Sequence, residues 1–178
     1  MLQRTLYRFI ESSEEPMSIP APFVWSDLKV LPEWVDENNH MNVAFYLKAF
    51  DDAFYEVYRA WGMDFAEVHA RGFTTFAAEN HITYQGELFL GDRFSVEVLL
   101  LDFDRKRIRW FNLMRKTDGS IAATCEWLLL FVNFHERRVA EMPDEFFNRL
   151  AEIKAVHDKL PRPPEAGRGI AIGNKRRE

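Results

Sequence analysis

The sequence lacks several features that define well-known classes of protein. Its 178 residues include one cysteine, Cys125, so no disulfide can form within the chain and no cysteine cluster can hold a metal. No run of about 18 apolar residues occurs, which argues against a membrane-spanning helix. We therefore expect a soluble, cytoplasmic protein in a reducing compartment.

Excess positive charge is also missing. Lys and Arg number 23 against 28 Asp and Glu, for a net charge of −5, whereas a nucleic-acid-binding domain is normally basic. The sequence has no glycine-rich phosphate loop, no Gly-x-Ser-x-Gly and no His-x-x-x-His, and no spacing of carboxylates favours a metal site. We expect neither a nucleic-acid partner nor a bound metal.

The composition is sufficient for one substantial core, because 47% of the residues are hydrophobic and 15% are aromatic. Proline and serine breakers interrupt the beginning of the chain, and Pro161 opens a proline- and glycine-rich end. We predict an N-terminal tail over residues 1–22, one domain over 23–160 and a C-terminal tail over 161–178.

Within this domain, residues 43–61 carry the clearest pattern. Apolar residues recur at steps of four and three over five turns, which predicts a long helix with one apolar stripe. Asn42 suits the N-cap position, and Gly62 suits the position just after the helix.

The flanking segments favour strands. Residues 23–31 read as a first strand, and 75–84, 94–101, 107–116 and 121–133 read as an antiparallel meander whose last turn contains Asp118-Gly119. A short helix is predicted from residue 144 to 153. The order of elements indicates an α+β domain in which a curved five-stranded sheet wraps one long helix.

The polar stretch before the long helix is the best candidate site. Asp36 could act as a general base or nucleophile, or could be only a turn residue. We expect the backbone N–H groups of Asn42, Val43 and Ala44 to be free at the helix start, where they could hold a carbonyl oxygen that gains negative charge. His40 could orient that carbonyl or move protons, or could serve only as a structural hydrogen-bonding group.

Other residues could contact a ligand. Asn39 could present its amide or could only adopt left-handed backbone angles. Glu79 and His81 lie two apart, on one face of a strand. They could pair as acid and base, could bind a ligand across a subunit boundary, or could form only a solvated or interface-facing polar row. The basic run Arg105, Lys106 and Arg107 could attract a phosphorylated ligand, or could sit at a solvated strand end.

The sequence has more aromatic surface than a small core needs, and two of the aromatic residues flank the loop. Trp25, Trp34, Phe45, Tyr46 and Trp110 could together cage a quaternary ammonium, although core packing would also explain each of them.

These features resemble the hotdog-fold acyl-CoA thioesterases of the 4-hydroxybenzoyl-CoA thioesterase type. Residues 36–42, Asp-Glu-Asn-Asn-His-Met-Asn, are similar to that group's Asp-x-x-Gly-His-(Val/Met)-Asn signature, with Asn39 in the place of glycine. Residues 39–46, 79–84, 101–107 and 122–126 are similar to the betainyl-CoA thioesterase branch. The chain departs from that branch at residues 130–133, where Phe131 and Asn133 replace the histidine and aspartate of a Leu-His-Val-Asp stretch.

The resemblance implies hydrolysis of a thioester to a free acid and coenzyme A. The substrate it implies is betainyl-CoA or a similar short acyl-CoA, and no cofactor is expected beyond the CoA of the substrate. It implies a homodimer or homotetramer with sites between subunits, with Asp36, His40, Asn42, Val43 and Ala44 in the catalytic centre. Substrate contacts are then expected from the remaining candidates: Asn39, Phe45, Tyr46, Glu79, His81, Arg105, Lys106 and Arg107.

Two other functions fit a hotdog domain less well. An enoyl-CoA hydratase would need an Asp and a His five residues apart, with supporting glycine and proline, whereas here the spacing is four and both supporting residues are missing. A non-catalytic domain that binds acyl-CoA or assembles with partners would not need Asp36.

Overall fold

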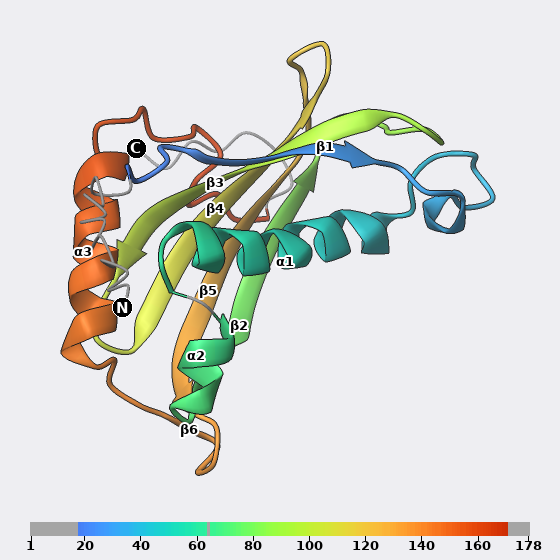
Figure 1. Ribbon diagram of the computed structural model, residues 1–178. Coiled ribbons are helices and arrows are strands. Elements are labelled where there is room, and N and C mark those ends of the chain that lie inside the picture. Colours follow the sequence, from blue (N-terminus) through green and yellow to red (C-terminus); the bar gives the residue numbers. More distant parts are fainter. Residues whose placement is uncertain (1–17, 64, 171–178) are drawn as a thin grey trace, which may run out of the picture.

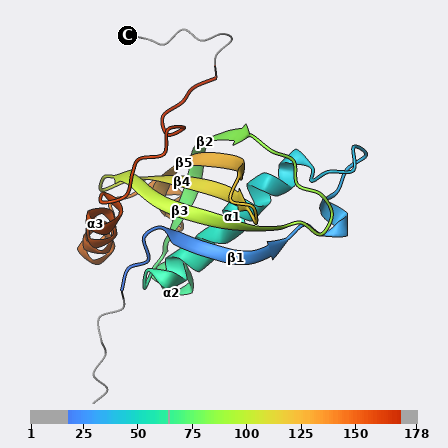
Figure 2. The ribbon, with the colours of Figure 1, turned by 90° about the horizontal axis from the view of Figure 1, so that it is seen from above.

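The structure is a computed structural model that describes residues 18–63 and 65–170. Its longest helix, α1 (Val43–Ala60), begins and ends where the apolar spacing predicts, with Asn42 as N-cap and Gly62 at φ 68° just beyond it. The helix lies across one face of the sheet, as Figures 1 and 2 show from two directions. The sheet therefore covers the apolar side of α1, and this contact forms the core.

The sheet is antiparallel throughout and has the strand order β1-β3-β4-β5-β2. The predicted five-stranded sheet around a helix is confirmed, and a two-residue strand, β6, adds to the edge of β5. The strands are β1 (Phe23–Lys29), β2 (Phe73–Tyr84), β3 (Arg93–Phe103), β4 (Arg107–Lys116), β5 (Ile121–Asn133) and β6 (Arg138–Val139).

Several boundaries differ from the prediction. Strand β1 ends at Lys29 rather than residue 31, after a bulge at which Asp27 has φ 61°. The C-terminal helix α3 (Asp144–His157) is a turn longer than predicted, and the short helices η1 (Pro32–Trp34) and α2 (Phe65–Ala70) were not predicted. A six-residue helix such as α2 is too short to show a period and is stabilised by its tertiary contacts.

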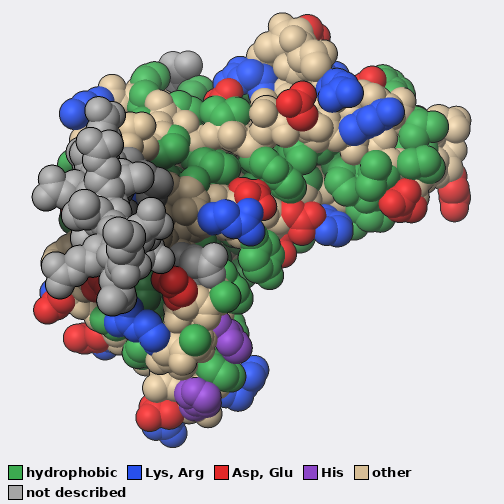
Figure 3. All heavy atoms as spheres, in the orientation of Figure 1, with side chains coloured by type: hydrophobic (Ala, Val, Ile, Leu, Met, Phe, Trp, Pro, Cys, Tyr) green, Lys and Arg blue, Asp and Glu red, His purple; other side chains and the backbone are tan. Residues whose placement is uncertain are grey.

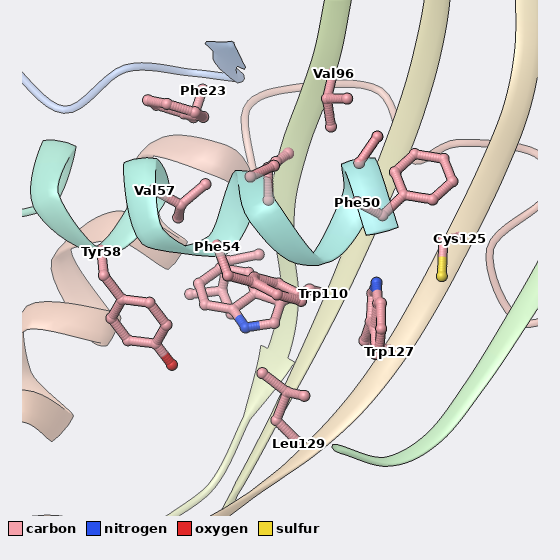
Figure 4. Packing of buried hydrophobic residues seen from close by; sticks show 14 of the residues in the cluster. Phe23, Phe50, Phe54, Val57, Tyr58, Val96, Trp110, Cys125, Trp127 and Leu129 are labelled. Atoms are coloured by element: carbon pink, nitrogen blue, oxygen red, sulfur yellow. The ribbon is translucent and has the colours of Figure 1, made fainter. Parts of the chain in front are cut away.

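The core between α1 and the sheet is rich in large rings. Phe50 and Val57 of α1 and its C-cap residue Trp61 are fully buried, and the Trp61 ring stacks on Trp110 of β4 with centroids 4.7 Å apart. Figure 4 shows this layer, in which Cys125 also lies; it is buried, as predicted. In contrast, Val43 at the helix start is 55% exposed, so the first residue of α1 lies outside the core.

The opposite face of the sheet is covered by the chain that follows α3. Leu160 and Ala166 pack against a cluster of Leu99, Phe111 and Leu113, and the Gly167 N–H donates to the Glu126 carboxylate at 2.6 Å. Residues 160–167 therefore run over the face that α1 does not cover. None of the helices in residues 18–63 and 65–170 is long and apolar enough to cross a membrane.

A buried histidine joins three parts of the fold. The Nδ1 atom of His157 accepts a hydrogen bond from the Leu100 N–H at 2.9 Å, and its Nε2–H donates to the Pro20 carbonyl at 2.9 Å. Nδ1 can accept only while it carries no proton, so this geometry requires the neutral ring. Burial lowers the pKa of His157, which is 3% exposed, below its ordinary value of 6.5.

We expect acid to destabilise the fold through His157. Below about pH 6.5 the unfolded chain takes up a proton at this residue before the folded chain does, so the stabilisation is complete above that pH and is lost as pH falls toward the lowered folded-state pKa. The variant His157→Phe should lose about 1–3 kcal/mol at pH 8, because the Leu100 N–H is left without an acceptor. It should also show a shallower loss of stability between pH 7 and 5 in urea unfolding. An unchanged slope in this variant would contradict the assignment.

Candidate active site

The loop before α1 is a tight, closed turn. The Asp36 N–H donates to the His40 carbonyl at 3.1 Å, and the Asn39 N–H donates to the Asp36 carbonyl at 3.0 Å. Met41, which is 1% exposed, anchors the end of the turn in the core and donates its N–H to the Leu88 carbonyl at 2.7 Å. The position of the turn is thus fixed by the core on one side and by its own hydrogen bonds on the other.

Asn39 takes the backbone conformation for which glycine is most suited. Its φ of 63° lies in the left-handed region, which asparagine adopts more readily than most residues with a side chain. The sequence-based interpretation of Asn39 as a residue of left-handed geometry is confirmed, and its substitution for glycine leaves the turn intact.

Asp36 is held by both of its carboxylate oxygens. Oδ1 accepts from the Asn38 N–H at 2.9 Å, and Oδ2 accepts from the Asn42 side-chain amide at 3.3 Å. The side chain is 22% exposed, so it remains accessible from solvent. These bonds orient the carboxylate toward the helix start.

His40 lies beside Asp36 without a close hydrogen bond to it. Its Nδ1 is 4.0 Å from the Asp36 Oδ1 and 3.3 Å from the Met41 carbonyl oxygen. A carbonyl can only accept, so Nδ1 carries the hydrogen in the latter contact and Nε2 is left unprotonated in the neutral ring. This contact supports a structural role for Nδ1, while leaving Nε2 free to meet a ligand.

Asn42 connects this carboxylate to the helix. Its Oδ1 accepts from the Ala44 N–H at 3.0 Å, which is the expected N-cap bond, while its own N–H donates to the Trp34 carbonyl at 2.9 Å. The prediction of three free N–H groups is therefore wrong for Asn42 and Ala44, because the cap and the loop use them. Within the described chain, the Val43 N–H has no hydrogen-bond partner.

Val43 thus offers the one free donor among the three predicted, at the positive end of an 18-residue helix. The carbonyl of the same residue accepts a hydrogen bond from the Tyr84 hydroxyl at 3.4 Å. The sequence analysis did not predict this contact. The end of β2 therefore closes over the helix start.

The aromatic residues near the loop brace it rather than form one cage. Phe45 stacks on Trp34 with ring centroids 5.5 Å apart. Tyr46 is 4% exposed, its hydroxyl donates to the Gly86 carbonyl at 3.3 Å, and burial raises its pKa. Trp110 lies in the core against Trp61, so it cannot join Trp34 around a ligand.

Glu79 and His81 lie on the face of the sheet that points away from α1. A bulge between Ala77 and Glu79 reverses the alternation of β2, so that Ala77 faces the helix side and Glu79 faces the other. Glu79 and His81 line a cavity of about 280 Å³ with the Arg109–Glu126 ion pair and residues 167–169. No hydrogen bond or ion pair in the described part of the chain joins them to Asp36.

The basic run lies at the turn between β3 and β4, beside α3, at the far end of the sheet from the Asp36 loop (Figure 1). Each of its members is paired with an acid: Arg105 with Asp144 at 2.6 Å, Lys106 with Glu141 at 3.5 Å, and Arg107 with Asp104 at 2.5 Å. Figure 3 shows that basic and acidic side chains alternate on the visible face. Within one protomer, these residues do not reach the loop.

One exposed group at the rim of a cavity has no counterpart in the sequence-based site. Asp51 of α1 lies beside aromatic side chains from α1, α2 and β5, at a cavity of about 110 Å³. The cavity beside Asp51 forms only when α2 and β2 pack against α1, so no local sequence pattern could predict it.

Comparison with known proteins gives the family. The sequence profile of the thioesterase-like superfamily matches residues 30–150. The betainyl-CoA thioesterase of Pseudomonas aeruginosa is 35% identical over 144 residues, which cover 80% of this chain and 91% of that protein. The chain belongs to the thioesterase-like superfamily, and the predicted resemblance to the betainyl-CoA branch is confirmed.

Two further proteins agree with this assignment. The L-carnitine dehydrogenase/betainyl-CoA thioesterase of Agrobacterium fabrum is 35% identical over 137 residues, which cover 77% of this chain but only 28% of that longer protein. A hypothetical protein of Staphylococcus aureus, solved in complex with CoA, has a TM-score of 0.80 and 32% identity, over 89% of this chain and all of that one. The hotdog fold is thereby confirmed.

The left-handed turn at Asn39 can be tested by substitution. We expect Asn39→Gly to keep nearly the stability of the natural chain, whereas Asn39→Val should lose about 1–3 kcal/mol, because a β-branched residue is strained at positive φ. Urea unfolding of both variants measures the difference. Equal stability of the two variants would show that this backbone conformation does not constrain the loop.

Proposed function

We propose that this chain hydrolyses acyl-CoA thioesters to a free acid and coenzyme A at the junction of the Asp36 loop and α1. One observation carries the proposal: the Asn42 side chain holds the Asp36 carboxylate on one side and caps the helix on the other, next to the free Val43 N–H. A carboxylate and an oxyanion donor are thus fixed a few atoms apart. The membership of a thioesterase superfamily supports the same reaction.

The chemistry follows from these two groups. A thioester carbonyl oxygen that accepts from the Val43 N–H gains stabilisation as it becomes negative, and the helix dipole adds to it. Water then adds to the carbonyl carbon while its proton passes to the Asp36 carboxylate, and the C–S bond breaks to release the thiolate of CoA. Alternatively, Asp36 itself attacks, the thiolate of CoA leaves, and water hydrolyses the resulting anhydride. The first route places Asp36 one water away from the carbonyl carbon, and the second places it in contact with that carbon.

His40 and Asn42 have different roles in this proposal. Asn42 positions Asp36 and leaves the Val43 N–H free by capping Ala44 instead. His40 braces the loop through the Met41 carbonyl, and its partly exposed ring has no hydrogen bond at Nε2 within the described chain, so a substrate group can meet that atom. The reaction needs no cofactor beyond the CoA carried by the substrate.

The protein is further proposed to work as a homodimer or homotetramer. Strand β2 is twelve residues long and forms a sheet edge that is unpaired within the described residues, and residues 76–80 are exposed along it. A long uncovered edge of this kind favours pairing with a second strand. Pairing of two β2 strands would extend the sheet and place two helix starts near the shared edge.

Replacement of the carboxylate tests the reaction directly. We expect Asp36→Asn to lower kcat for release of thiol from acyl-CoA by about 10²–10⁴-fold, because the amide can neither accept the proton nor attack. The matched control is Glu37→Gln, an exposed neighbour that should keep full activity. Turnover that survives in Asp36→Asn, with an unchanged melting temperature, would contradict the proposal.

The assembly is tested separately by light scattering in solution. We expect the mass of a dimer or tetramer for the natural chain and a lower mass for Ala78→Arg, which adds charge at the exposed β2 edge. A natural chain that remains monomeric at all concentrations would contradict pairing through β2.

A further inference from the structure

A cavity of about 110 Å³ lies between α1, α2 and the β2 edge, on the helix side of the sheet. By the same measure a single water needs only about 10–15 Å³, so the space suits a small organic group. We call it the aromatic pocket, and define it by five rings and one carboxylate: Phe54, Tyr55, Tyr58, Phe65, Trp127 and Asp51.

The rings contact one another around the pocket. Phe54 meets Trp127 edge to face at 5.3 Å, and Phe65 of α2 meets Tyr55 and Tyr58 at 5.4 and 6.4 Å. Figure 4 shows Phe54 and Tyr58 extending from α1 toward β5, where Trp127 lies. The Tyr58 hydroxyl is already bonded to Thr75 at 3.5 Å, so this polar group has a partner inside the protein.

Asp51 is the single carboxylate among the described residues that line this pocket; it is exposed to solvent at the rim, and no cationic side chain of the described chain lies within ion-pair distance of it. Lys48, three residues earlier on the same helix, bonds to Asp52 at 2.5 Å instead. Partial burial, followed by the neighbouring Asp52 charge, raises the pKa of Asp51. A carboxylate held beside aromatic rings without a counter-ion is stabilised by a cation that enters the pocket.

The surroundings select the type of cation. Aromatic faces attract a positive charge, and a quaternary ammonium needs no hydrogen-bond acceptors, whereas a primary ammonium must satisfy three donors. We propose that the aromatic pocket binds a quaternary ammonium group, and that in the thioesterase this group belongs to the acyl part of the substrate. The second half of this statement rests on the proposed function.

The position of the pocket ties it to the proposed dimer. Asp51 follows Val43 by eight residues, about 12 Å along the helix, so a short acyl group cannot span both within one protomer. Helix α1 runs antiparallel to β2, since Tyr84 contacts Val43 and Thr75 contacts Tyr58. A two-fold axis at the β2 edge reverses the second helix and brings its first turn toward the pocket of the other protomer.

The relatives are consistent with this chemistry. The matched proteins of Pseudomonas aeruginosa and Agrobacterium fabrum are named for betainyl-CoA, whose acyl group ends in a trimethylammonium. For this chain, the rings and Asp51 provide a structural basis for the same preference.

A pair of isosteric esters tests the inference. Betainyl-CoA and 3,3-dimethylbutanoyl-CoA have the same shape, but only the first is charged. We expect the natural chain to hydrolyse betainyl-CoA with the higher kcat/KM, and Asp51→Asn and Tyr55→Leu to lower that value about 5- to 30-fold with little change for the neutral ester. Asp52→Asn is the matched control, because its carboxylate pairs with Lys48 outside the pocket. Equal loss on both esters, or no preference in the natural chain, would overturn the proposal.

Direct binding separates this inference from the proposed function. If neither ester is hydrolysed, the proposed function fails, and calorimetric titration with choline and its neutral isostere 3,3-dimethylbutan-1-ol then decides the pocket alone. The proposed binding of a quaternary ammonium is supported if the natural chain binds choline, if Asp51→Asn binds choline more weakly, and if the neutral alcohol does not bind. Absence of choline binding, or equal binding in Asp51→Asn, overturns it.

Discussion

One side-chain amide joins the parts of the candidate active site. Asn42 donates to the Asp36 carboxylate, accepts from the Ala44 N–H, and ties its own backbone to Trp34. Without this amide the carboxylate would lose its direct bond to the helix cap, and the first turn would lose the side-chain acceptor of the Ala44 N–H. The free Val43 N–H is a consequence of the same arrangement, because the cap bonds Ala44 and passes over Val43.

The rest of the fold holds this junction in place. Large rings fix α1 against the sheet, and Met41 and Leu88 fix the preceding loop to the segment before β3. The start of the helix lies outside this packed layer, as the exposure of Val43 shows. Rigid packing at one end of α1 and accessibility at the other are what a site on a helix N-terminus requires.

Local patterns in the sequence predicted much of this. The helix, its cap, the Asp118-Gly119 turn and the meander follow from spacing and turn chemistry, and the loop signature led to the thioesterase class. Features that depend on distant contacts were missed or misjudged. The bulge in β2 puts Glu79 on the opposite face of the sheet from Ala77. Acids from other segments form ion pairs with Arg105 and Lys106. The rings that line one pocket come from α1, α2 and β5 rather than from the loop.

The central claim is that the Val43 N–H stabilises the oxyanion, and deletion of that single hydrogen tests it. Val43 is the first helical residue and Asn42 before it is extended at φ −63° and ψ 144°, so proline fits there and removes only the N–H. The measurement is kcat for acyl-CoA hydrolysis by Val43→Pro against Val43→Ala, which keeps the N–H. We expect a loss of about 10²–10³-fold in the proline variant alone, with an unchanged melting temperature. Equal activity of the two variants would contradict the account.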